Sequence, residues 1–191
     1  LNATQVSFEK FLEQVNAQRD PGDYNSLLWI GETYFGLGQG VKDDPGTAQP
    51  YFEKASAAYS NILDNELATG TSVLAIRLRQ VRCFRAMGRY QEAVDLAASI
   101  LEQSPASLDV QFEAAYALAD WGADPAGDPA KLLESMNGVE PAEGQKKVIW
   151  GWSGITTRLT RQQPAPEWAT LEEKFLEARF AQPNSRYRYA A

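Results

Sequence analysis

The chain has 191 residues, a net charge of −7 from 25 acidic and 18 basic side chains, and no histidine. The excess of negative charge opposes binding to the phosphate backbone of nucleic acids, so no nucleic-acid partner is expected. The lack of histidine excludes Ser-His-Asp and Cys-His catalytic groups and imidazole-ligated metals, and we expect no cofactor. The single cysteine, Cys83, excludes an intrachain disulfide and is expected to be a buried structural thiol.

No stretch approaches the ~18 apolar residues of a membrane-spanning helix, so we expect no membrane insertion. A soluble protein is therefore predicted, and its compartment is left open between the cytoplasm, the periplasm and the cell envelope. The sequence begins Leu1-Asn2, without an initiator methionine or a signal-peptide pattern. This beginning leads us to expect a processed product or a piece of a longer chain.

Glycine and proline divide the chain into segments of helical length, and within them apolar residues recur at spacings of three and four. No segment shows the alternating pattern of a strand, so the predicted fold class is all-α. In chain order, the predicted helices cover residues 4–18, 24–37, 48–65, 71–87, 90–103, 107–121, 129–136, 142–162 and 166–181. The glycine- and proline-rich segments 39–50 and 122–129 are predicted to be mobile loops.

The predicted helices form pairs that repeat along the chain. In residues 74–107 a helix, a glycine-containing turn, a second helix and a proline make a unit of about 34 residues. Small and apolar residues recur at matching positions of the pairs: Leu27, Ile30, Gly31, Tyr34, Ala55 and Tyr59; Ala93, Ala97, Ile100 and Pro105; Ala114, Ala115, Leu118 and Gly122; Trp150, Gly154, Leu171, Phe175, Ala178 and Pro183. This pattern resembles the tetratricopeptide repeat family, whose unit is a pair of antiparallel helices.

The resemblance implies one repeat domain over residues 1–191, in which helical hairpins stack as a right-handed superhelix. The implied elements are an extra N-terminal helix, 4–18, and hairpins over approximately 24–65, 71–105, 107–137 and 142–183. Gly31 and Gly154 are expected to let two helices of a hairpin approach closely, as are Ala93 and Ala97. The five tryptophans are expected mainly in the core, above all Trp29, Trp150 and Trp168.

Members of this family bind peptides on the concave side of the superhelix, which the first helix of each hairpin lines. The resemblance therefore implies a non-catalytic scaffold that binds a peptide segment or a neighbouring domain. The candidate groove residues at the corresponding positions are Glu32, Phe35, Leu78, Arg82, Arg85, Phe112, Tyr116 and Arg158. Some members grip a terminal carboxylate with lysine and asparagine at these places, and that set is absent from this sequence.

Arginines cluster where such lysines would lie. Arg82, Arg85 and Arg89 follow an i, i+3, i+7 spacing and are predicted to share one helix face. Guanidinium groups bind carboxylates in a bidentate manner, so the arginines favour a groove for an acidic peptide. The alternative is that they form ion pairs with acidic residues of the next helix, namely Asp109, Glu113 and Asp120.

Two other functions stay open at this point. One is a carboxylate-dependent enzyme on a helical-hairpin scaffold, such as a glycoside-cleaving enzyme, which needs two acids roughly 5–9.5 Å apart across a cleft. The other is a structural or self-assembling module. We expect the chain not to be an enzyme, because no clustered acids with aromatic neighbours stand out in the sequence.

Overall fold

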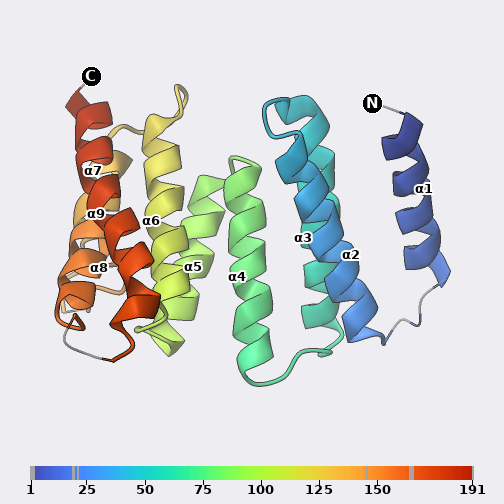
Figure 1. The fold of residues 1–191 in the computed structure, drawn as a ribbon, viewed down its shortest axis with the longest axis horizontal. Coiled ribbons are helices and arrows are strands. Elements are labelled where there is room, and N and C mark those ends of the chain that lie inside the picture. Colours follow the sequence, from blue (N-terminus) through green and yellow to red (C-terminus); the bar gives the residue numbers. More distant parts are fainter. Residues whose placement is uncertain (1–2, 19, 21, 145, 164–165, 191) are drawn as a thin grey trace. The chain divides into compact units, whose positions relative to one another are not determined.

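The computed structural model describes residues 3–18, 20, 22–144, 146–163 and 166–190, with side chains in the first helix from residue 9 onward. Within these residues it contains nine α-helices and no strand, which confirms the all-α prediction. The chain forms two compact units, Leu1–Met87 and Gly88–Ala191, and each is described by itself. Inside each unit, helices that follow one another in sequence pack together (Figure 1).

The first unit contains four helices: α1 (Ala3–Gln18), α2 (Tyr24–Gly40), α3 (Pro45–Asp64) and α4 (Thr71–Ala86). The start of α2 is fixed by Asp23, whose carboxylate accepts hydrogen bonds from two backbone N–H groups of the first turn at 3.0 and 3.1 Å. Asp44 caps α3 by accepting a 3.3 Å hydrogen bond from the backbone N–H of Thr47, and Pro45 occupies the first helical position. The prediction of a mobile loop over residues 39–50 is therefore wrong, because only residues 41–44 separate the two helices.

Glycines on α2 allow it to pack tightly against α3. A Cβ atom added to Gly31 would lie 2.5 Å from the ring of Tyr59, and one added to Gly38 would lie 2.6 Å from the ring of Phe52. The two glycines are seven residues apart, and so are the two aromatic rings, in the reverse order. The helices are therefore antiparallel, and the prediction that Gly31 permits a close approach is confirmed (Figure 1).

The core of the first unit contains aliphatic side chains of all four helices, such as Leu12, Ile30, Ile62 and Ile76. Cys83 is buried among them, as predicted. Trp29, in contrast, is 45% exposed, so its predicted place in the core is wrong.

The buried thiol gives a test of this core. Burial, and to a lesser extent the charge of Glu32, raises the pKa of Cys83 to about 12. In the unfolded chain a cysteine titrates near pH 8.5, so this contribution to stability is complete below about pH 8.5 and falls as the pH rises toward the folded value. We expect an aromatic disulfide reagent at pH 8 to leave the native thiol unmodified and to react fully in denaturant. Rapid reaction of the native chain would show that α4 does not bury this residue.

The second unit contains five helices: α5 (Tyr90–Gln103), α6 (Leu108–Ala123), α7 (Ala130–Asn137), α8 (Gly151–Thr160) and α9 (Trp168–Ala190). Phe112 of α6, Trp152 and Ile155 of α8, and Phe175 of α9 form its aromatic core. The ring centroids of Phe112 and Trp152 are 5.6 Å apart, in an edge-on arrangement. A buried hydrogen bond of 3.1 Å between the hydroxyl groups of Ser135 and Ser185 links α7 to α9.

Three predictions about the second unit are wrong. The predicted helix 142–162 begins only at Gly151, and residues 142–144 and 146–150 are not helical. The last helix does not end at residue 181 but continues through Pro183 to Ala190. A Cβ atom added to Gly154 would meet Trp150 and Arg158 of its own helical turns, so this glycine does not serve a joint between helices.

Candidate binding groove

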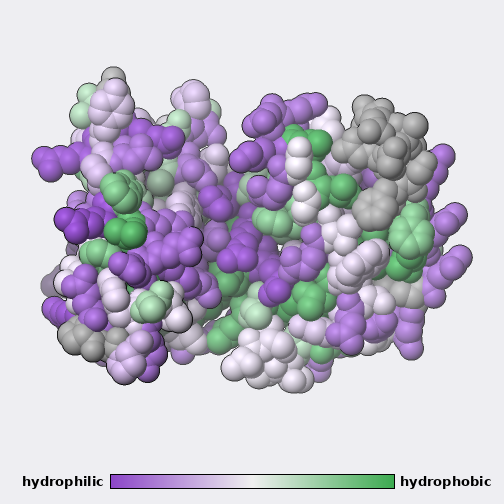
Figure 2. Space-filling view, in the orientation of Figure 1, coloured by the Kyte–Doolittle hydropathy of each residue, from purple (hydrophilic) through white to green (hydrophobic). Residues whose placement is uncertain are grey.

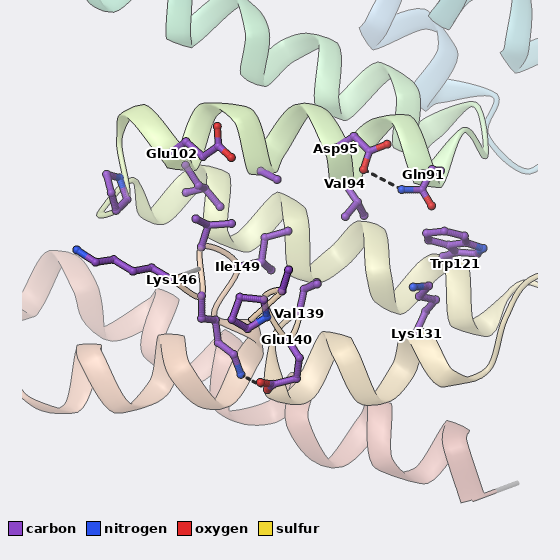
Figure 3. Close-up of a pocket in the computed structure, with 17 residues that line it drawn as sticks. Gln91, Val94, Asp95, Glu102, Trp121, Lys131, Val139, Glu140, Lys146 and Ile149 are labelled. Atoms are coloured by element: carbon purple, nitrogen blue, oxygen red, sulfur yellow. Dashed lines mark hydrogen bonds and ion pairs between the residues drawn. The ribbon is translucent and has the colours of Figure 1, made fainter. Parts of the chain in front are cut away.

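A groove of about 800 Å³ lies in the second unit, between α5 and the segment that joins α7 to α8 (Figure 3). Its apolar lining comes from both walls: Val94, Ala98 and Leu101 on α5, and Val139, Val148 and Ile149 on the joining segment. Trp121 and Lys131 lie together at one end of it (Figure 3). The volume is in the range of sites that bind small molecules or a few peptide residues.

The α5 wall follows from the spacing of its residues. Gln91, Val94, Asp95, Ala98, Leu101 and Glu102 recur at intervals of three and four, which places them on one helix face. Val94 and Leu101 are buried, whereas Asp95 and Glu102 are exposed. The wall therefore has an apolar base and an acidic rim. The side-chain amide of Gln91 donates a 2.8 Å hydrogen bond to the Asp95 carboxylate.

The opposite wall is a loop whose two ends touch. Gly138 and Gly151 have φ angles of +83° and +65°, in the left-handed region that favours glycine. A Cβ atom added to Gly151 would lie 2.3 Å from the backbone nitrogen of Gly138. Any side chain at Gly151 would therefore force the ends of the loop apart.

A buried amide holds the loop against α6. The side chain of Gln111 is fully buried, and its Nε2 donates to the carbonyl oxygens of Val148 at 2.7 Å and Pro105 at 3.3 Å. Its Oε1 accepts a 2.9 Å hydrogen bond from the backbone N–H of Trp150. Gln111 thus replaces the backbone partners that a strand or helix would otherwise supply to these groups.

The side of the groove opposite α5 carries three lysines, Lys131, Lys146 and Lys147, and one acidic residue, Glu140. The ammonium group of Lys131 lies 4.8 Å from the centroid of the Trp121 ring and 2.9 Å from a carboxylate oxygen of Glu134. Lys147 donates to the carbonyl oxygen of Asn137 at 3.1 Å and pairs with Glu140, and Lys146 lines the groove as well. Figure 3 shows Asp95 and Glu102 on the α5 side and Lys131 and Lys146 on the other.

A smaller hollow of about 240 Å³ adjoins the groove at the start of α5. Gln91 and Trp121 line both spaces, and Arg89 and Glu92 line only the smaller one. Arg89 forms a bidentate ion pair with Glu92, which lowers the pKa of that carboxyl group. The indole ring of Trp121 therefore stands where the two spaces meet.

The predicted groove residues of the first unit gather at a different place. Glu32, Phe35 and Arg82 line a hollow of only about 40 Å³, together with Tyr59 and Arg79. Glu32 and Arg79 form an ion pair across it. This space is too small for a peptide side chain.

The other two residues predicted in the first unit, Leu78 and Arg85, are half-buried on α4. Helix α4 ends at Ala86, so the predicted shared face of Arg82, Arg85 and Arg89 is wrong: Arg89 lies outside that helix. Arg82 and Arg85 each have interaction partners. Whether these two arginines bind a peptide stays a prediction.

The predicted residues of the second unit lie in and around its aromatic core. Phe112 is buried there, and the ring centroid of Tyr116 is 4.8 Å from that of Trp152. The Tyr116 hydroxyl donates to Glu177, whose pKa is raised by burial and by the nearby charge of Glu113. The guanidinium of Arg158 lies 3.5 Å from the centroid of the Trp150 ring.

The groove on α5 was not predicted from the sequence. None of the eight predicted groove residues is among the described residues that line it. Two features of the sequence correspond to its walls. On α5, the small Ala98 lies between acidic residues on a second helix face. Gly138 interrupts the helical pattern before a run of mixed apolar and lysine residues.

The described residues contain neither a metal-binding cluster nor a membrane-spanning helix. No cluster of three or more Cys, Asp or Glu side chains in them is placed to hold a metal ion. No helix in that part of the chain is both long and apolar enough to cross a membrane. Comparison of the sequence and the structure with protein-family models, curated proteins and solved structures gives no match.

Proposed function

We propose that the chain is a non-catalytic interaction scaffold of tetratricopeptide-like hairpins, stacked as a right-handed superhelix, that binds a short extended segment of a protein partner. The observation that carries this proposal is the groove between α5 and the described residues 139–144 and 146–149, which we call the loop 139–149, with its apolar base and charged rims. This location differs from the one expected from the sequence, because it uses a face of α5 and an irregular loop and none of the eight predicted groove residues.

The dimensions of the groove set the length of the bound segment. The α5 wall runs from Gln91 to Glu102, and a helical rise of about 1.5 Å per residue makes it roughly 16 Å long. An extended chain advances about 3.3 Å per residue, so the groove holds about five residues. Alternate side chains of such a segment point to opposite sides, so two or three of them reach the apolar base.

The charges at the rim favour a particular kind of segment. Asp95 and Glu102 on α5 attract basic side chains, and Lys146 on the other side attracts acidic ones, whereas Lys131 and Lys147 pair with Glu134 and Glu140. We therefore propose a partner segment with apolar residues at the centre and charges of both signs, of which the acidic ones face Lys146. Rim charges of this kind contribute more to orientation and association rate than to affinity.

A substitution in the base of the groove tests the proposal. Ala98 is half-buried at the middle of the α5 wall, and Ala98→Arg fills the space above it with a long charged side chain. Five- to seven-residue peptides selected on the wild-type chain from a display library are titrated by fluorescence anisotropy. We expect the variant to bind them at least about tenfold more weakly, as for the loss of a central interface contact.

The matched control is Ala57→Arg, the same substitution on an exposed position of α3 beside a different hollow, of about 240 Å³. This variant is expected to bind the selected peptides as the wild type does. Equal affinity of Ala98→Arg and the wild type would contradict the proposed site. A loss confined to Ala57→Arg would move the binding site to the first unit.

A further inference from the structure

Helix α9 carries an exposed apolar stripe that no other helix of its unit covers. Leu176, Phe180 and Tyr187 are 43%, 71% and 75% exposed, and Pro183 between them is exposed as well. Figure 2 shows green, hydrophobic surface over α9 among purple surroundings. Apolar side chains that gather on a soluble surface typically mark an interaction site.

The spacing of the stripe is that of a helix-pairing seam. Its four residues follow one another at intervals of four, three and four, which is the a/d pattern of a coiled coil. The residues that hold α9 in its own unit, Phe175, Ala178 and Ser185, are buried on another face. The helix therefore has two apolar faces, of which one packs against its own unit and the other is exposed to solvent.

The charges on α9 are arranged in two blocks. The half before residue 178 has three glutamates, Glu172, Glu173 and Glu177, and one lysine, Lys174, which pairs with Asp109 of α6 at 2.5 Å. The half after residue 178 has three arginines, Arg179, Arg186 and Arg188, and no acidic residue. One copy of this helix is thus complementary in charge to another copy that runs in the opposite direction.

We propose that the stripe is a self-association surface, on which α9 pairs antiparallel with α9 of a second copy of the chain. The two stripes contact each other over their full length in one register, in which Leu176 faces Tyr187 of the second copy and Phe180 faces its Pro183. The acidic half of each helix then lies beside the basic half of the other, and the opposed helix dipoles add to the attraction. The pairing has two-fold symmetry, so it closes as a dimer and does not grow into filaments.

The expected dimer is reversible. A 23-residue helix is roughly 34 Å long, and one helix pair buries less surface than the interfaces of permanent complexes.

The proposal does not depend on the groove, which is formed by α5, α6, α7 and the loop 139–149.

Sedimentation equilibrium of the full chain over a range of micromolar concentrations is the first test. We expect the wild type to be in monomer–dimer equilibrium and Phe180→Glu to raise the dissociation constant at least about tenfold, because it buries a charge in the seam. The control is Tyr189→Glu, which is 47% exposed but lies off the stripe and is expected to leave the equilibrium unchanged. A wild type that stays monomeric at the highest concentrations, or equal effects of the two variants, would overturn the proposal.

Disulfide trapping tests the orientation. Cys83 is buried, so cysteines introduced at Glu173→Cys and Ala190→Cys are the reactive ones. In the antiparallel pairing position 173 of one copy faces position 190 of the other. Oxidation of a mixture of the two variants should therefore give a cross-linked dimer, and oxidation of either variant alone should not. If each variant alone forms a cross-linked dimer, the helices pair in parallel and the proposal is overturned. Circular dichroism checks that each variant remains folded.

Discussion

Replacement of Gln111 with alanine is expected to lower the free energy of unfolding by about 2–4 kcal/mol, because it leaves buried backbone groups of the loop without partners. The N–H of Trp150 loses its acceptor, and the carbonyl oxygen of Val148 loses its donor. The loop 139–149 should open more often as a result. Urea unfolding measures the loss of stability, and hydrogen exchange at the Trp150 amide, which should become faster, locates it.

The control for this prediction is Gln91→Ala on the exposed rim of α5, where the amide donates a hydrogen bond to Asp95. A surface change of this kind is expected to alter stability by less than about 0.5 kcal/mol. If the two alanine variants were equally stable, Gln111 would not hold the loop and the groove wall would need another anchor.

Gly31→Ala is expected to destabilise the first unit by about 1–3 kcal/mol, although alanine is the better helix former by about 1 kcal/mol. The added Cβ atom would lie 2.5 Å from the ring of Tyr59, which is buried. The joint between α2 and α3 must then widen. Thermal unfolding followed by circular dichroism gives the change.

Gly36→Ala is the matched control on the same helix, because no atom lies within 4 Å of the Cβ atom it adds. Here only the helix preference acts, and a gain of about 0.5–1 kcal/mol is expected. Opposite signs for the two substitutions would confirm the packing of α2 against α3. A stabilising Gly31→Ala would mean that the helices are not in close contact at this point.

The positions of the helices could be read from the sequence because their signals are local. Asp23 and Asp44 cap helices by hydrogen bonds to residues two or three positions away, and the apolar spacing of α6 and α9 follows the helical repeat. Ala97, one of the small residues of the predicted repeat pattern, is likewise fully buried.

The predictions failed where proline or distant contacts decide the structure. Pro50 and Pro183 lie inside helices, although a proline favours the end of a helix. Residues 146–150 have an apolar pattern that fits a helix, yet Gln111, 37 residues before Val148, binds them in an irregular conformation. No property of the local sequence reveals such a contact.

The candidate site was missed for a related reason. The sequence identifies faces of helices, but a groove depends on what lies opposite a face. The wall opposite α5 falls, from residue 142 onward, in a segment predicted as helix. Phe112, which the resemblance assigns to a binding surface, has a buried ring that packs against Trp152.

Hydrogen–deuterium exchange of the wild-type chain, with and without a selected peptide, tests the proposed groove most directly. If the peptide binds in the groove, we expect it to slow amide exchange in the loop 139–149, because the irregular backbone of the loop lies beside the bound segment. The exchange rates of α2 and α4 should stay unchanged. Slower exchange confined to α2 and α4, around Glu32 and Arg82, with an unchanged loop would contradict it and place binding in the first unit.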